Sequence, residues 1–306
     1  PQMVPEGETP LPEFIEIDNL TSTVFDIAEW EVTGGVSYTF PGFDPAAATD
    51  SFLIGRRKIV VCEGDPAAFR AAYGVSEAIQ VFGPWTGSLD NAGERVTLRD
   101  KNGVIMASVR YDDKHPWPVA PDGAGHSLVL TDSERATDDY RSWGPSSRVG
   151  GFPGNSDSAV VSALFINEVH FDENGDVDWI EIHNSSQTPQ SVDGFFLSGA
   201  RGFGDKVNIS GSVPGNGFLS FDVGFSNNSV AFLVDTNNVV RSAVDYDRDT
   251  GRDHAAAYPD GSTDFYSSAQ GSRDAPNNPD RETGVVINEL MLEPPSGHRD
   301  GEFIEL

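Results

Sequence analysis

Positive charge is scarce in this 306-residue sequence. Lys and Arg together number 20 against 48 Asp and Glu, so the formal net charge is −28, and only four of the basic residues are Lys. Recognition of nucleic-acid phosphates is built on a positive surface, so this balance argues against a nucleic-acid partner. It also argues against docking on anionic lipid. An Asp-rich, Lys-poor surface stays soluble by self-repulsion, and we expect it to suit a salty or calcium-containing medium.

Cysteine is almost absent. The one cysteine, Cys62, lies in the apolar run IVVC, which excludes an intrachain disulfide and predicts a buried strand thiol. No apolar run approaches the roughly 18 residues of a membrane-spanning helix, so we expect no membrane insertion. Without disulfides the fold depends on its hydrophobic core. The chain begins at Pro1 without a charged-then-apolar leader, and we expect it to be an internal piece of a longer protein.

Leucine is infrequent beside the β-branched residues. The chain has 42 Val and Ile against 14 Leu, which favours strands, and its 32 Gly and 20 Pro predict many turns. One segment is typical of a helix, GDPAAFRAAYG at 64–74. Asp65 is suited to cap its start, Pro66 to its first turn and Gly74 to its end.

The sequence repeats itself, and this is its strongest signal. The stretch VTLRDKNGVIMASVRYD at 96–112 aligns without a gap with AFLVDTNNVVRSAVDYD at 231–247. Both have polar tips between β-rich arms and predict hairpins. Upstream, EFIEIDN at 13–19 matches DWIEIHN at 178–184, and EFIEL at 302–306 is a third copy. Short strands separated by turn residues predict an antiparallel sandwich in each copy.

The repeats predict the domain organisation. Residues 1–157 form one domain that lacks its first strand, residues 158–282 a complete domain, and residues 283–306 the start of a third, truncated copy. The missing strand corresponds to FINEV at 165–169, and its absence should leave a sheet edge open in the first domain. VINEL at 286–290 matches FINEV, so it is a candidate to fill that edge in this molecule or a neighbour.

These motifs resemble the lamin-tail domain family. The resemblance rests on INEV followed by DWIEIHN, on VDGFFLSG at 192–199, and on PDG at 121–123 and 259–261. It implies an immunoglobulin-like fold. We therefore predict an all-β protein of two immunoglobulin-like antiparallel β-sandwich domains in tandem, with one short helix inserted in the first. Bacterial domains of this kind resemble accessory modules of large exported proteins, which implies an extracellular or cell-surface location.

Two acidic runs are candidate cation sites. Alternating oxygen ligands beside a permissive glycine are what a flexible calcium loop requires. Neither run fits the helix–loop–helix calcium pattern, and we favour solvated acidic turns over a metal site. Calcium is thus the one cofactor the sequence suggests, and none is required. The candidate ligands are Asp172, Asn174, Asp176 and Asp178 in the first run, and Asp245, Asp247, Asp249 and Asp253 in the second.

Aromatic and carboxylate side chains supply two further candidates. Trp85, Trp117 and Trp143 lie in turn-rich segments, where they would either stack on sugars or plug the open ends of a sandwich. Glu168 and Glu181 lie on strands that the resemblance pairs. Such a pair serves acid/base chemistry if one pKa is raised. We favour a structural role in which both accept hydrogen bonds from turn amides.

The six histidines lie in no nucleophile-elbow, metalloprotease or paired-histidine motif, and we assign no catalytic residue. The sequence therefore predicts a non-catalytic structural or interaction module for spacing, adhesion or partner docking. The alternatives are a glycan-binding module that uses exposed Trp and a cation-assisted hydrolase that uses the acidic runs. The expected partners are other domains of the same polypeptide and an extracellular protein or polysaccharide.

Overall fold

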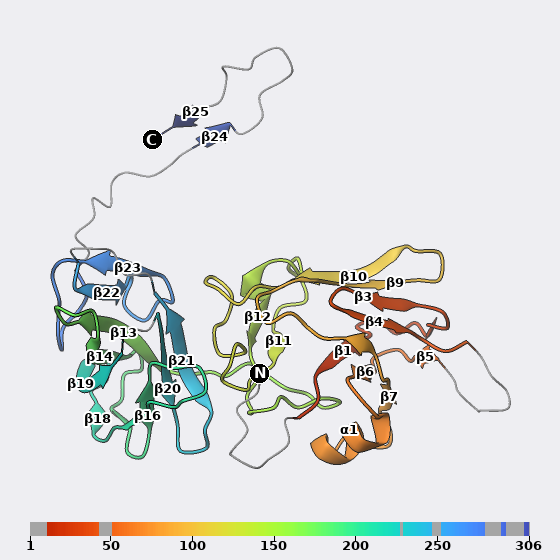
Figure 1. The fold of residues 1–306 in the computed structure, drawn as a ribbon, viewed down its shortest axis with the longest axis horizontal. Helices are drawn as coiled ribbons and strands as arrows, with labels where there is room; N and C mark the ends of the chain where they lie inside the picture. Colours follow the sequence, from red (N-terminus) through yellow and green to blue (C-terminus); the bar gives the residue numbers. More distant parts are fainter. Residues whose placement is uncertain are drawn as a thin grey trace.

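Short β-strands make up nearly all of the regular structure, and α1 (Pro66–Tyr73) is the one α-helix in the described part of the chain (Figure 1). The computed structural model describes residues 11–42, 51–226, 229–246 and 252–278. It also describes the backbone of the hairpin formed by β24 (Glu289–Met291) and β25 (Phe303–Glu305). The predicted all-β, antiparallel fold is confirmed.

Two facing sheets form the first unit. One has three strands in the order β1–β6–β7, and the other has five in the order β10–β9–β3–β4–β8. Two short ribbons, β2–β5 and β11–β12, and the 3₁₀ turn η1 complete it. The elements are β1 (Phe14–Asp18), β2 (Phe25–Asp26), β3 (Glu31–Thr33), β4 (Val36–Thr39), β5 (Phe52–Leu53), β6 (Lys58–Cys62), β7 (Gln80–Phe82), β8 (Thr86–Gly87), β9 (Arg95–Arg99), β10 (Ile105–Arg110), β11 (Leu128–Leu130), η1 (Tyr140–Ser142) and β12 (Trp143–Pro145).

Strand β6 is apolar on both faces because it separates two hydrophobic clusters. Ile59 and Val61 point into the core between the sheets, and Val60 and Cys62 point the other way, against Phe69 of α1. This alternation is the period-2 geometry of a strand. Cys62 is fully buried, as predicted, and burial raises the pKa of its thiol to about 11. Such a thiol stays protonated and unreactive at neutral pH.

The helix begins and ends where the sequence predicts. The Asp65 carboxylate accepts a hydrogen bond from the Ala68 amide at 2.9 Å, and Pro66 occupies the first turn. Gly74 ends the helix in the left-handed conformation, with φ of 65°. The helix connects β6 to β7, which pair in parallel, unlike all the other strand pairs described. Parallel neighbours require a crossover, and the inserted segment supplies it.

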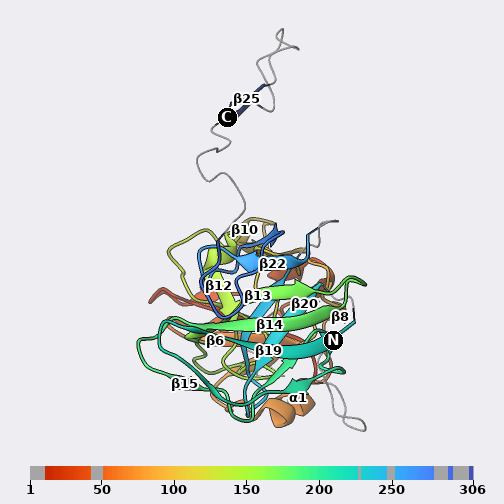
Figure 2. The same cartoon turned by 90° about the vertical axis from the view of Figure 1, so that its left-hand side faces the viewer.

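The second unit is a larger sandwich. Its first sheet has the order β19–β14–β13–β22–β23 and its second the order β17–β16–β20–β21, with the ribbon β15–β18 beside them (Figure 2). The strands are β13 (Leu164–Phe171), β14 (Val177–Asn184), β15 (Gln190–Ser191), β16 (Phe196–Ser198), β17 (Val207–Asn208), β18 (Ser212–Val213), β19 (Phe218–Phe225), β20 (Val230–Val234), β21 (Val240–Asp245), β22 (His254–Ala257) and β23 (Phe265–Ser268).

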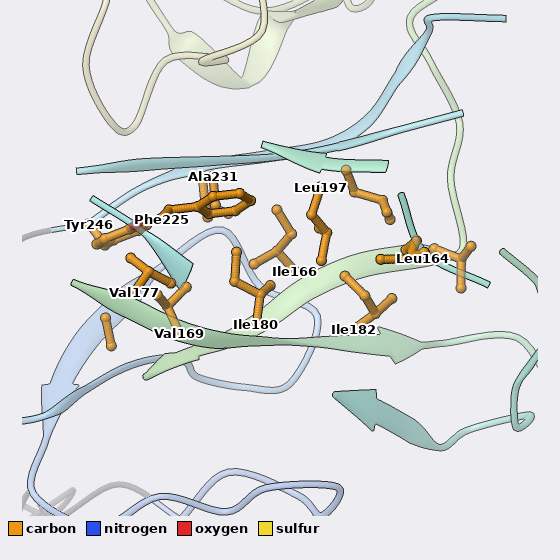
Figure 3. Close-up of a cluster of buried hydrophobic side chains, with 14 of the residues drawn as sticks. Leu164, Ile166, Val169, Val177, Ile180, Ile182, Leu197, Phe225, Ala231 and Tyr246 are labelled. Carbon is orange, nitrogen blue, oxygen red and sulfur yellow. The ribbon is translucent and has the colours of Figure 1, made fainter. Parts of the chain in front are cut away.

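The core of the second unit lies between these two sheets (Figure 3). Ile180 and Ile182 of β14 and Val169 of β13 point into it from one side, and Leu197 of β16 meets them from the other. Glu181 lies between the two isoleucines in sequence and therefore faces the opposite side of the sheet. Each unit thus encloses an apolar interior of its own.

Matching residues of the two copies make the same local bonds. The stretches 96–112 and 231–247 both contain antiparallel hairpins, β9–β10 and β20–β21. At their tips the Asp100 carboxylate accepts from the Asn102 amide at 2.9 Å, and the Asp235 carboxylate accepts from the Asn237 amide at 2.8 Å.

A second repeated feature is the asparagine that ends the IE strand. Asn19 donates to the Thr23 carbonyl at 2.7 Å, and Asn184 donates to the Thr188 carbonyl at 2.9 Å. Each side chain also accepts from an amide two residues on, Thr21 or Ser186 respectively, at 3.0 Å. These bonds close the turn after the strand, which is the role that the sequence indicates.

The expected open edge is present in the first unit. Among the described strands β1 pairs only with β6, whereas its counterpart β14 pairs with both β13 and β19. Residues 286–288 of the candidate edge-filling segment lie outside the described residues. Residues 289–291 form β24 and pair with β25 rather than with β1.

The buried asparagines give a first test of the repeat. Replacing Asn184, which is fully buried, with Ala removes a donor to three carbonyl groups and should lower the free energy of unfolding by about 2 kcal/mol. Asn19→Ala should destabilise the first unit comparably. Exposed Asn102 serves as the control, since Asn102→Ala should cost less than about 0.5 kcal/mol. Guanidinium unfolding measures all three, and equal small effects at the three positions would contradict the shared role.

Candidate functional site

The first acidic run forms the turn between β13 and β14. The Asp172 carboxylate accepts from the amides of Asn174 and Asp176, both at 2.9 Å, and closes the turn. The Asn174 side-chain amide also donates to it, and this hydrogen bond is the main cause that lowers the pKa of Asp172. A calcium ion bound by Asp172 would have to displace these hydrogen bonds. The run therefore has the internal bonding of a solvated acidic turn, which is the interpretation favoured from the sequence.

The second acidic run lies at the ends of β21 and β22. Asp245 accepts a hydrogen bond from the His115 amide at 3.1 Å, which ties it to the first unit. Asp247 and Asp249 lie outside the described residues. Asp253 precedes β22, and its side chain is 57% exposed. Of the two predicted calcium ligands of this run that the structure describes, Asp245 already accepts a hydrogen bond and Asp253 is exposed.

The three tryptophans have different environments. Trp85 is 5% exposed and belongs to the core of the first unit, and Trp117 is 9% exposed. Trp143 is half-buried, lies 6.4 Å from Trp117 between ring centroids, and donates from Nε1 to the Thr137 carbonyl at 2.9 Å. Of the three candidate stacking residues, only Trp143 keeps part of its ring accessible.

A cluster of histidines joins one residue from each acidic run. His170 of β13 lies directly opposite His254 of β22, and their ring centroids are 4.7 Å apart. Asp178 Oδ2 lies 3.2 Å from His170 Nδ1, and Asp253 Oδ1 lies 3.5 Å from His254 Nε2. His170, Asp253 and His254 each present a ligand atom within 4.8 Å of the others. Among the described residues, this is the one group of three or more such side chains placed to hold a metal ion.

Neighbouring residues fix the positions of the two rings. Trp179 of β14 stacks on His170, with centroids 5.3 Å apart and an interplanar angle of 10°. Gly271 packs on His254 so closely that a Cβ there would lie 2.1 Å from Cε1 of the ring. His254 is consequently only 8% exposed. No local sequence pattern marks this cluster, because 84 residues separate the histidines and only the cross-strand register brings them together.

Carboxylate and amide side chains of the same sheet hold the segment that follows β23. Asn167, Glu168 and Glu181 are all fully buried. The Glu181 carboxylate accepts from the Asp274 amide at 2.6 Å, and Glu168 accepts from the Ser272 amide at 3.1 Å. Asn167 donates from its side-chain amide to Glu181 at 3.0 Å and to Asp260 at 3.1 Å. The predicted role of the two glutamates as acceptors for turn amides is confirmed.

The first unit repeats this arrangement in a simpler form. Glu16, the counterpart of Glu181, accepts from the Gly154 amide at 2.7 Å and pairs with Lys58 Nζ at 2.5 Å. The ammonium group balances the charge of Glu16, whereas no cation lies within ion-pair distance of Glu181 among the described residues.

The pKa of Glu181 is raised to about 8. Burial away from water is the main cause, and the neighbouring Glu168 carboxylate raises it further, against hydrogen bonds from Asn167 and Asp274 that lower it. Because the proton is held more tightly in the folded state, this group stabilises the fold fully at acidic pH. That contribution is lost as the pH rises from the ordinary value of 4.5 through about 8.

A pH-dependent unfolding experiment tests this assignment. Between pH 7 and 8.5 the wild-type chain should lose stability, and Glu181→Gln, which cannot ionise, should lose measurably less. Glu173→Gln removes the same charge from an exposed turn and should keep the wild-type pH dependence. Denaturant midpoints at the two pH values provide the readout. An unchanged pH dependence in Glu181→Gln would show that the titrating group lies elsewhere.

The two units meet through an apolar cluster. Val119, Ala120 and Ala124 of the first unit pack with residues of β16, β20, β21 and the β16–β17 turn, the sheet that faces the first unit in Figure 1. The Phe203 ring makes edge contacts with two neighbouring rings, at 5.3 Å from Phe196 and 5.6 Å from Phe232. The residues from the second unit are Phe196, Phe203, Val230, Phe232, Val234 and Val240.

Polar contacts surround this cluster. Asp122 forms an ion pair with Arg201. His126 is 5% exposed; its Nδ1 donates to the Ser146 carbonyl at 2.7 Å and its Nε2 accepts from the Val240 amide at 3.1 Å. A carbonyl can only accept, so these partners require a neutral ring protonated on Nδ1.

Comparison with family models, with curated proteins and with solved structures finds no match to this chain. Within the described residues, no helix has the length and apolar character needed to cross a membrane.

Proposed function

We propose that the chain is a non-catalytic structural and interaction module that holds neighbouring parts of a larger protein at a fixed spacing and orientation. In this proposal the two units are lamin-tail-like, immunoglobulin-like modules in tandem. The observation that carries this proposal is the junction, where residues 119–126 of the first unit pack on the second.

The composition of the junction favours rigidity. Interfaces between domains of one chain are typically polar and permit relative motion, whereas an apolar interface restrains it. Here Phe232, Val234 and Ala120 are each at most 2% exposed, so separating the units would transfer these side chains to water. This cost disfavours hinge motion between the two units.

Directional contacts supplement the apolar burial. His126 joins a carbonyl of one unit to an amide of the other, and Asp122 pairs with Arg201. Gly123 has a φ of 81°, and a Cβ there would lie 2.8 Å from Cβ of Arg201. Such contacts depend on orientation, so they select one relative arrangement from those that the apolar surfaces alone would permit.

The proposed setting follows from the charge. A net charge of −28 disfavours nucleic acid and anionic lipid, and it suits an exported or cell-surface protein in a salty medium. The proposed partners are other domains of the same polypeptide and an extracellular protein or polysaccharide.

Distance measurements between spin labels test the rigid junction. Cys62 is buried, so labels can be placed at new cysteines in exposed turns, Asn91→Cys in the first unit and Glu173→Cys in the second. The wild-type background should give a narrow distance distribution, and Phe203→Ala should broaden it by removing the central ring. Val161→Ala, at a residue 87% exposed, is the control and should leave the width unchanged. A broad distribution in the wild-type background would contradict the proposal.

The junction should also respond to acid. Burial is the main cause that lowers the pKa of His126, with the Ser146 carbonyl, Asp157 and Asp235 acting in the opposite direction. A lowered pKa means that the neutral form stabilises the folded state fully above the ordinary value of 6.5, and this contribution is lost as the pH falls below it. Protonation of Nε2 also removes the acceptor for the Val240 amide.

The same labelled chain measures this effect. We expect the distance distribution to broaden between pH 7.5 and pH 5, and His126→Gln, which does not titrate, to give one width at both values. A control at His183, which stacks on Phe218 within the second unit, is His183→Gln, and it should retain the wild-type response. A pH response that survives in His126→Gln would assign it to another group.

A further inference from the structure

The cluster on β13 and β22 has the donor atoms and the geometry of a transition-metal site. Two imidazoles and one carboxylate, from His170, His254 and Asp253, present ligand atoms within 4.8 Å of one another. The histidines are paired across two adjacent strands, so their positions are set by the backbone register of the sheet and not by a loop. Sites supported by rigid elements hold their ligands more accurately than sites built on loops.

One ring nitrogen of each histidine in the cluster makes no hydrogen bond to the described residues. Nδ1 of His170 and Nδ1 of His254 are both buried and make no hydrogen bond within the described structure. Each nevertheless lies close to a carboxylate oxygen, at 3.2 Å from Asp178 and 3.0 Å from Glu168 respectively. These carboxylates face the Nδ1 side of the rings, and in His254 the opposite nitrogen, Nε2, is the one that faces Asp253.

The separation between His254 and Asp253 suits a small tetrahedral cation. Ligands about 2.05 Å from a tetrahedral zinc ion lie about 3.3 Å from one another. His254 Nε2 and Asp253 Oδ1 are 3.5 Å apart, which is close to that spacing. On its other side, His254 directs Nδ1 towards the Glu168 carboxylate at 3.0 Å. A carboxylate behind a histidine ligand fixes its ring and makes it a stronger donor.

We propose that His170, His254 and Asp253 bind one divalent transition-metal ion of the zinc class, with Glu168 as the positioning carboxylate behind His254. Imidazole nitrogen with a single carboxylate suits zinc, nickel or copper, whereas calcium prefers a set of six to eight oxygens. His170 and Asp253 are partly exposed, so the fourth coordination position faces solvent and takes water or a donor from a partner. The site thus differs in ligand chemistry from the calcium site that the acidic runs suggest.

Cobalt and zinc titrations of the full chain, prepared without a histidine tag and stripped with chelator, test this site. Calorimetry should show one zinc ion per chain, and cobalt should give the visible absorption bands of a coordinated, tetrahedral ion. Calcium at the same concentrations should neither bind at this site nor displace cobalt.

Variants assign the ligands. His170→Gln and His254→Gln should each weaken zinc binding by at least about tenfold and abolish the cobalt bands, and Glu168→Gln should weaken binding by about tenfold. The matched controls are His183→Gln, a histidine stacked on Phe218 outside the cluster, and Asp172→Asn in the acidic turn. Both controls should bind zinc as the wild type does.

Circular dichroism and thermal melts of each variant separate loss of the site from loss of the fold. In the wild-type chain zinc should raise the melting temperature, and in folded His254→Gln it should not. Absence of zinc and cobalt binding in the wild-type chain overturns the proposal. So does binding that persists unchanged in both folded histidine variants. If a histidine variant fails to fold, Asp253→Asn is tested in its place for loss of zinc binding. Asp253 is exposed, so removing its charge should leave the fold intact.

Discussion

Buried carboxylate and amide side chains on the sheets hold the irregular, glycine- and proline-rich tail of each unit in place. Backbone amides that leave a sheet still need acceptors when they are buried. In the second unit Glu181 and Glu168 supply them to Asp274 and Ser272, and in the first unit Glu16 supplies one to Gly154. In the two sheets that carry these glutamates, the apolar face forms the core and the opposite face anchors the tail.

The histidine cluster of the second unit depends on this anchoring. In the second unit it brings the segment after β23 over the sheet, where Gly271 covers His254 and completes the histidine cluster. In the first unit the tail supplies residues 119–126 to the junction. A glutamate in the strand motif FIE or WIE thus holds a segment that lies 138 or 93 residues further along the chain.

The sequence was most informative where a local rule determines the structure. The helix at 66–73 follows from Asp65 and Gly74, and the two hairpins follow from their polar tips and β-rich arms. Cross-strand register and packing between units have no such local signal. The pairing of His170 with His254, the parallel β6–β7 pair and the junction around Phe203 therefore emerged only from the structure. The burial of Trp85 and Trp117 agrees with the packing alternative that the sequence left open beside sugar stacking.

Residual dipolar couplings of the backbone amides test the rigid arrangement of the two units most directly, because they report the orientation of each sandwich in solution without any substitution. Couplings measured in weakly aligned solution should fit a single alignment tensor for residues 11–157 and 158–278 when both are placed as in Figure 1. Two tensors that differ in magnitude or direction would show that the units reorient independently, and would contradict the proposed role as a fixed spacer.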